Sequence, residues 1–164
     1  MLKSTMLLKP DLLVEAAYEV DSTLLKSHGK SALMVDLDDT VIPSNSSLMA
    51  PSFKCWFKTL KKDDIAILIL SNGQPERVHY WANNLGVDGV ALVGKPFSFA
   101  FKRGLKRLGH QPSETAMLGD QLFTDVLGAN ITGIFSILVR PLTAGRLPHT
   151  RLLRKFENII VRRP

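Results

Sequence analysis

Three carboxylates, Asp36, Asp38 and Asp39, directly follow the apolar run at residues 32–35. A short apolar run of this kind is typical of a buried strand, so the carboxylates stand where that strand would meet solvent. Carboxylates at such close range repel one another and raise each other's pKa. We therefore expect a bound cation, or a reaction, at this point of the chain.

Polar side chains also follow the other apolar runs of the sequence. They are Ser71 and Asn72 after residues 65–70, Lys95 after residues 90–93, and Asp120, with Asp125 five residues on, after residues 115–118. In an open parallel sheet, ligands bind beyond the carboxyl ends of the strands. The order of these residues therefore predicts that they gather with the first carboxylates at one edge of a sheet.

Phosphoryl transfer is the chemistry that suits this set. Asp36 and Asp38 are two residues apart, so in extended backbone their side chains point the same way. One carboxylate can attack phosphorus while the other protonates the leaving oxygen. Mg²⁺ would be held by Asp36, Asp120 and the backbone carbonyl of Asp38. Ser71 and Lys95 would hold the phosphoryl oxygens, where negative charge gathers in the transition state.

Alternation of strands and helices predicts the fold. The expected strands are the apolar runs at residues 32–35, 65–70, 90–93, 115–118 and 134–139. The expected helices have apolar residues at helical spacing and lie at residues 51–62, 75–85, 97–108 and 121–130. This order indicates an α/β, Rossmann-like three-layer sandwich with a parallel sheet. We expect one domain over residues 1–164, with a helical lead-in at 1–30 and a basic amphipathic segment at 146–164.

The composition narrows the setting of the protein. The 164 residues are 45% hydrophobic, which suits one globular domain with a sizeable core. The single cysteine cannot form an internal disulfide and fits a reducing compartment. No apolar run approaches the roughly 18 residues of a membrane span. A cytoplasmic protein, free or peripheral at a membrane, is the expectation, with an organelle as the alternative.

The net charge of +6 lies entirely near the carboxyl terminus. Residues 140–164 hold seven of the 21 basic residues and one of the 15 acidic residues, so the rest of the chain is neutral. Within that segment, Leu152, Leu153, Phe156, Ile159 and Ile160 follow helical spacing. A basic amphipathic helix can bind anionic lipid at a membrane surface, and it can equally pack on its own domain as a last helix.

The motifs "DLDDT", "GKP" and "GDQLFTD", with a serine at the second strand end, resemble those of the haloacid dehalogenase (HAD) superfamily of phosphatases. This resemblance implies that Asp36 forms an aspartyl-phosphate and that Asp38 serves as general acid and then as general base. By the same resemblance, Ser71 and Lys95 are implied to bind phosphate, and Thr40 to support the first loop. The implied Mg²⁺ ligands are Asp36, Asp38 and Asp120. Asp125 is implied to orient the metal shell or Lys95. Thr40 and Asn72 complete the phosphate-binding candidates, although Asn72 could instead satisfy loop backbone.

More narrowly, "MVDLDDTVIP" and "LILSNGQPERV" resemble the YqeG-type branch of that superfamily, which includes phosphatidylglycerophosphate phosphatases. In the superfamily, cap domains that set specificity are inserted between the residues matching Asp36 and Ser71, or between those matching Ser71 and Lys95. Here the two intervals of 35 and 24 residues are filled by one helix, its loops and a strand. A member without a cap domain, and therefore an open site, is expected.

The expected function is Mg²⁺-dependent hydrolysis of a phosphomonoester through an aspartyl-phosphate, with phosphatidylglycerophosphate as the substrate and an anionic membrane surface as a partner. One alternative substrate is a phosphoprotein or a soluble phosphomonoester. A non-catalytic module that binds RNA or a ribosomal partner through the basic segment is the alternative of another class. Such a module would be expected to lose Asp36 or Asp38, and both are present, so nucleic acid is the less favoured partner.

Overall fold

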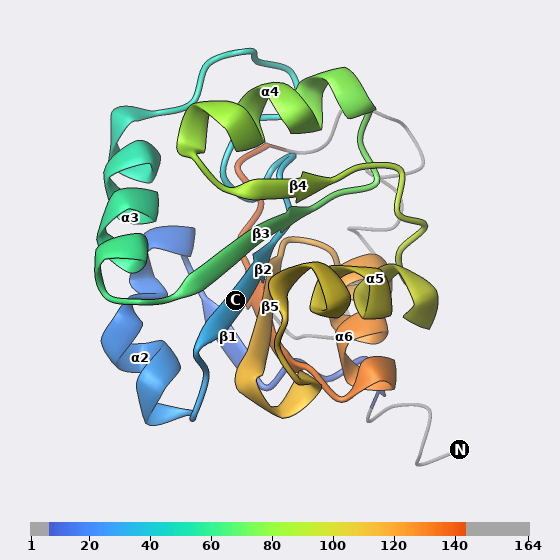
Figure 1. Cartoon of the computed structure of the whole chain (residues 1–164). Coiled ribbons are helices and arrows are strands. Elements are labelled where there is room, and N and C mark those ends of the chain that lie inside the picture. Colours follow the sequence, from blue (N-terminus) through green and yellow to red (C-terminus); the bar gives the residue numbers. More distant parts are fainter. Residues whose placement is uncertain (1–6, 144–164) are drawn as a thin grey trace.

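The computed structural model describes residues 7–143, which build one sheet of six parallel strands with helices on both faces (Figure 1). The strands are β1 (Leu12–Val14), β2 (Ala32–Val35), β3 (Ala66–Leu70), β4 (Asp88–Val90), β5 (Thr115–Gly119) and β6 (Phe135–Val139). Their order across the sheet is β1-β6-β5-β2-β3-β4. The predicted α/β sandwich is confirmed, and β2 lies between β5 and β3, where the strand order reverses.

Helices cover the two faces of the sheet as separate layers (Figure 1). They are α2 (Ser22–Ser27), α3 (Pro51–Lys62), α4 (Pro75–Leu85), α5 (Ser98–Leu108) and α6 (Leu127–Thr132). Helices α3 and α4 pack on one face, and α5 and α6 pack on the other. The intervals on either side of Ser71 each contain one of these helices, so neither holds a cap domain.

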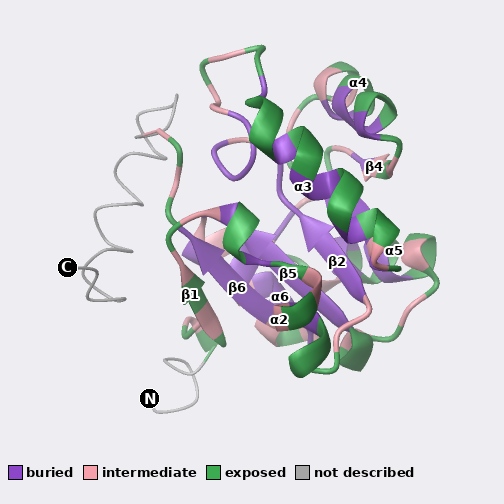
Figure 2. Ribbon diagram, turned by 90° about the vertical axis from the view of Figure 1, so that its left-hand side faces the viewer, coloured by how far each residue is buried: buried purple, intermediate pink, exposed green. Residues whose placement is uncertain are grey.

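The core follows from the alternation of side chains along the central strands. Leu33 and Val35 of β2 pack with the side chains of α3 and α4, whereas Met34 between them packs with α5 and α6. Both faces are therefore apolar, which is why these strands are continuous apolar runs in the sequence. Figure 2 shows the central strands buried and the outer sides of the helices exposed.

Helix boundaries were predicted well where proline or glycine marks them. Helices α3 and α4 begin at Pro51 and Pro75, and both have the predicted bounds. Gly86 ends α4 with a φ of 63°, a left-handed conformation that glycine adopts at low cost. The predicted segment 121–130 contains a π-helical turn, Leu122–Val126, before α6 begins.

Two of the expected element positions were wrong. The strand expected at residues 90–93 is β4, and it ends at Val90. Beyond it the chain turns, because Leu92 has a φ of 47° and its backbone N–H donates to the carbonyl of Gly73. The lead-in at residues 1–30 contains α2 but also the strand β1, which pairs with β6. Strand β1 is only three residues long, too short for a clear period-2 pattern.

The basic amphipathic segment expected at residues 146–164 lies outside the described residues. Within residues 7–143, no helix combines the length and the hydropathy needed to cross a membrane.

Candidate active site

The loop after β2 presents the first carboxylates in a fixed shape. Leu37, Val41 and Ile42 are fully buried and anchor the loop in the hydrophobic core. Asp39 adopts a φ of 62°, and its carboxylate accepts hydrogen bonds from the backbone of Ser44 and the hydroxyl of Thr143. Asp39 therefore serves the fold of the loop.

Lys95 is the centre of the buried part of the site. Its Nζ lies 2.6 Å from Oδ1 of Asp36 and 2.6 Å from Oδ1 of Asp125, and it donates a third bond of 2.8 Å to the carbonyl of Leu70. Three elements therefore converge here: the end of β2, the end of β3 and the π-helical turn after β5. Lys95 is 6% exposed and Asp125 1%.

Asp120 completes a group of three carboxylates at the carboxyl ends of β2 and β5. Oxygen atoms of Asp36, Asp120 and Asp125 all lie within 4.8 Å of one another. Asp120 accepts a hydrogen bond of 3.3 Å from the hydroxyl of Thr40. A Cβ at Gly119 would overlap the Asp125 carboxylate, so the close approach of Asp125 requires glycine at this position.

The electrostatics of this group fit a divalent cation. Burial, opposed by Lys95 and reinforced by Asp125, raises the pKa of Asp36 to about 7. Burial would lower the pKa of Lys95, but Asp125 and Asp36 outweigh it, so the pKa lies above the ordinary lysine range. Two of the three carboxylates, those of Asp36 and Asp125, share the single ammonium group of Lys95. Oxygen ligands of this kind suit a hard divalent cation.

The outer part of the site is formed by Asp38, Ser71 and Arg77. A Cβ at Gly73 would lie 3.1 Å from Oγ of Ser71 and 3.2 Å from Oδ2 of Asp38, so these two side chains border the same small space. Arg77, in the first turn of α4, donates from Nε to Oδ1 of Asp38 at 2.8 Å and also bonds the carbonyl of Pro43. Asp38 is thus held beside the space over Gly73.

The structure brings all the predicted residues to one edge but gives two of them other partners. Asn72 donates to the carbonyl of Lys95 and accepts from its backbone N–H, so its amide holds the lysine loop. This contact favours the loop-backbone alternative for Asn72. Asp125, expected only in support, lies within the carboxylate group itself.

Arg77 had no predicted role in the sequence. Its position one turn into the helix that follows Ser71 could have indicated a residue near the same edge.

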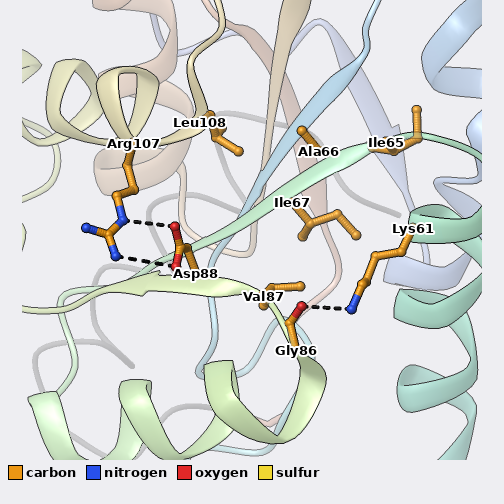
Figure 3. Close-up of a pocket in the computed structure, with 9 residues that line it drawn as sticks. All are labelled: Lys61, Ile65, Ala66, Ile67, Gly86, Val87, Asp88, Arg107 and Leu108. Atoms are coloured by element: carbon orange, nitrogen blue, oxygen red, sulfur yellow. Dashed lines mark hydrogen bonds and ion pairs between the residues drawn. The ribbon is translucent and has the colours of Figure 1, made fainter.

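A second pocket lies at the opposite edge of the sheet, near the start of β3 and β4 (Figure 3). It has a volume of about 530 Å³, and its lining includes Lys61, Asp88 and Arg107. Arg107 pairs with Asp88 at 2.9 Å, and Lys61 donates to the carbonyl of Gly86 at 2.7 Å, at the carboxyl end of α4. The one carboxylate that lines this pocket is therefore exposed and paired, unlike the buried carboxylates at the carboxyl edge.

Comparisons with known proteins agree with this geometry. The sequence model of the haloacid dehalogenase-like hydrolases matches residues 4–131. A probable phosphatase YqeG of Bacillus subtilis is 31% identical over 93% of this chain and 88% of its own length. A chloroplastic and mitochondrial phosphatidylglycerophosphate phosphatase 1 of Arabidopsis thaliana is 27% identical over 94% of this chain, which spans 47% of the plant protein.

Solved structures share the fold. The cobalt-bound deoxy-D-mannose-octulosonate 8-phosphate phosphatase of Haemophilus influenzae aligns with a TM-score of 0.55 at 14% identity, over 84% of this chain and 90% of that one. An uncharacterized protein of Listeria monocytogenes aligns with a TM-score of 0.58 at 21% identity, over 72% of this chain and 85% of that one. At these identities the likeness concerns the arrangement of strands and helices.

Proposed function

The chain belongs to the haloacid dehalogenase-like hydrolases and is a phosphatase, and we propose that it transfers a phosphoryl group first to Asp36 and then to water. One observation carries this proposal. The carboxylate of Asp36 is buried beside Asp120 and Asp125 and accepts a 2.6 Å hydrogen bond from Lys95. A carboxylate held in this way is positioned as a nucleophile, with positive charge close by to stabilise the transferring group.

In the first half-reaction, a carboxylate oxygen of Asp36 forms a bond to phosphorus while the bond from phosphorus to the leaving alcohol breaks. Asp38 gives its proton to the oxygen of that alcohol. In the second half-reaction, Asp38 takes a proton from water as the water oxygen bonds to phosphorus. Inorganic phosphate then leaves, and the carboxylate of Asp36 is restored.

The other residues bind and orient the phosphoryl group. Lys95 offers positive charge and Ser71 a hydroxyl donor to its oxygens, and the narrow space over Gly73 lies next to Ser71 and Asp38. Asp36 and Asp120, with the backbone carbonyl of Asp38, would hold Mg²⁺, and Asp125 would support the site by pairing with Lys95. That ion, when bound, neutralises the carboxylates and the negative charge of the phosphoryl oxygens. Thr40 orients Asp120 through its hydroxyl.

The substrate that we favour is phosphatidylglycerophosphate, and the protein would then work at an anionic membrane surface. A relative from Arabidopsis thaliana carries that activity in its name. The absence of a cap domain between Asp36 and Lys95 leaves the edge accessible to a bulky lipid head group. A phosphoprotein or a soluble phosphomonoester is the alternative substrate for the same site.

A phosphate-release panel tests this proposal. The purified protein is assayed with phosphatidylglycerophosphate in mixed micelles and with a set of soluble phosphomonoesters, with chelator and with added Mg²⁺. We expect the highest kcat/KM on the lipid, loss of activity with chelator and recovery with Mg²⁺. A higher kcat/KM on a soluble ester would overturn the lipid substrate, and full turnover in metal-free buffer would overturn the cation.

A further inference from the structure

Two aromatic side chains at the start of α5 are exposed to solvent. Phe97 and Phe99 are 64% and 61% exposed, and their rings are stacked, with centroids 5.8 Å apart and planes within 8°. Leu92, in the loop before them, is 58% exposed. Large apolar side chains are normally buried, and an exposed group of them marks a surface for contact.

This apolar group is next to the candidate active site. The loop that contains Leu92 runs beside the end of β3, where the backbone N–H of Leu92 donates to Gly73. A Cβ on Gly94, the residue before Lys95, would lie 3.0 Å from the ring of Phe99. The backbone of Phe97 in turn bonds the carbonyl of Gly94. The same loop therefore positions Lys95 inside the site and the aromatic pair outside it.

The charged residues that neighbour the pair in the sequence are all basic. No acidic residue occurs between Asp88 and Glu114. Lys102 and Arg103 are exposed, and they follow Phe99 by three and four residues, which places them on the same side of α5. An apolar, aromatic surface bordered by basic side chains is complementary to an anionic lipid surface, where aromatic rings enter the interface and cations meet the head groups.

We propose that Leu92, Phe97, Phe99, Lys102 and Arg103, here called the α5 surface, rest on an anionic lipid bilayer and turn the carboxyl edge of the sheet toward the head-group phosphates. This inference rests on the proposed function, because it gives the proposed lipid substrate a route to Asp36. The α5 surface does not include any residue of the basic segment 146–164, so it requires a test local to α5.

A tryptophan at position 97 provides that test. The full-length Phe97→Trp protein is mixed with vesicles of phosphatidylcholine and phosphatidylglycerol whose acyl chains are brominated, and its fluorescence is compared with that of the unsubstituted protein. We expect added quenching from the new tryptophan. Tyr18→Trp is the matched control, because Tyr18 is 55% exposed but lies among Glu15, Glu19 and Asp21. Vesicle binding without quenching at position 97, or with equal quenching at position 18, would overturn the proposal.

The charge component is tested with Lys102→Gln/Arg103→Gln. We expect at least a tenfold weaker binding to the same vesicles, since each cation near an anionic surface adds attraction that salt screens. Lys58→Gln/Lys62→Gln removes the same charge from exposed positions on α3 and should bind as the unsubstituted protein does. Equal binding by both double variants would count against the α5 surface. Thermal unfolding of each variant confirms that it is folded.

The binding tests and the phosphate-release panel separate the two proposals. Because the vesicles contain no phosphatidylglycerophosphate, quenching at position 97 does not depend on turnover. If quenching occurs but a soluble ester is the better substrate, the α5 surface stands and the lipid substrate falls. If phosphatidylglycerophosphate is the better substrate but position 97 is not quenched, the substrate stands and the α5 surface falls.

Discussion

At the amino ends of β3 and β4, Arg107 pairs with Asp88 in the open, with side chains 60% and 53% exposed. At the carboxyl ends, Lys95 is buried among the carboxylates of Asp36 and Asp125, with Asp120 close to both. The two edges belong to the same sheet and have similar charged residues. At the amino edge both charged side chains are exposed to water, whereas at the carboxyl edge the charged side chains are buried.

This difference indicates which edge is built for chemistry. An exposed ion pair such as Arg107–Asp88 contributes little to stability, because water solvates and screens both charges. Buried carboxylates that outnumber their cations destabilise a fold unless something else compensates them. The carboxylates of Asp36, Asp120 and Asp125 gather within 4.8 Å of one another, and a bound cation with a reaction would account for such a buried group.

The largest effect expected at either edge is that of Asp36→Asn, compared with Asp88→Asn. The first removes the nucleophile, and we expect kcat to fall by on the order of 10⁴-fold or more. The second makes the same chemical change in the exposed pair, where kcat should stay within about twofold of the unsubstituted protein. Steady-state phosphate release measures both. Residual activity of a few per cent in Asp36→Asn would contradict a covalent mechanism.

A smaller and selective loss is expected for Asp38→Asn. General acid and base catalysis typically contributes about 10²–10⁴-fold, and a good leaving group needs less help from the acid. Formation of the phosphoenzyme should therefore slow less on an aryl phosphate than on an alkyl phosphomonoester. Rapid-quench burst kinetics on both substrates measures this step. Equal slowing on the two substrates would argue against Asp38 as the acid.

The residues that lie at the edges of the sheet were predicted well, because the ends of strands and the starts of helices are marked by the local sequence. Pro51 and Pro75 mark the first residues of α3 and α4, and the residues after each apolar run do meet at one edge. The end of β4 could not be predicted, because residues 90–93 are all apolar and the turn at Leu92 depends on a contact with Gly73.

The sequence also could not predict which side chains of the site contact one another. Asp125 lies in a helical turn, and its distance from Asp36 depends on how closely that turn packs against Gly119. Arg77 meets Asp38 across 39 residues of chain, through a side chain whose direction only the packing of α4 decides. The stacking of Phe97 on Phe99 likewise depends on the helix start, since both residues could have been buried.

The pH dependence of stability sharpens the contrast between the edges. In chelator, Asp36 has a pKa of about 7 in the folded chain, against 3.8 for an aspartate freely exposed to water, so the folded state binds the extra proton. Stability from this group is full below about pH 4 and is lost as the pH rises to 7, by up to about 4 kcal/mol.

Asp36→Asn should therefore be more stable than the unsubstituted protein at pH 8, and the difference should shrink toward pH 5. Urea unfolding of both proteins across this range, in chelator, measures it. A constant difference between Asp36→Asn and the unsubstituted protein at all pH values would mean that Asp36 is already ionised throughout.

The smallest expected effect is the difference in kcat between variants of two arginine–aspartate pairs that have nearly equal distances. Arg77 Nε lies 2.8 Å from Asp38, and Arg107 Nε lies 2.9 Å from Asp88. We infer that Arg77 is a positioning residue, because it bonds the carboxylate of Asp38, the proposed acid. Arg77→Gln should therefore lower kcat about tenfold, as expected for one hydrogen bond to a charged group. Arg77→Lys should recover part of that loss, because a cation beside Asp38 is kept. Arg107→Gln should leave kcat unchanged and the free energy of unfolding little altered, because that pair is exposed. Equal kcat values for Arg77→Gln and Arg107→Gln would mean that Asp38 keeps its position without Arg77, and that the two pairs differ only in exposure.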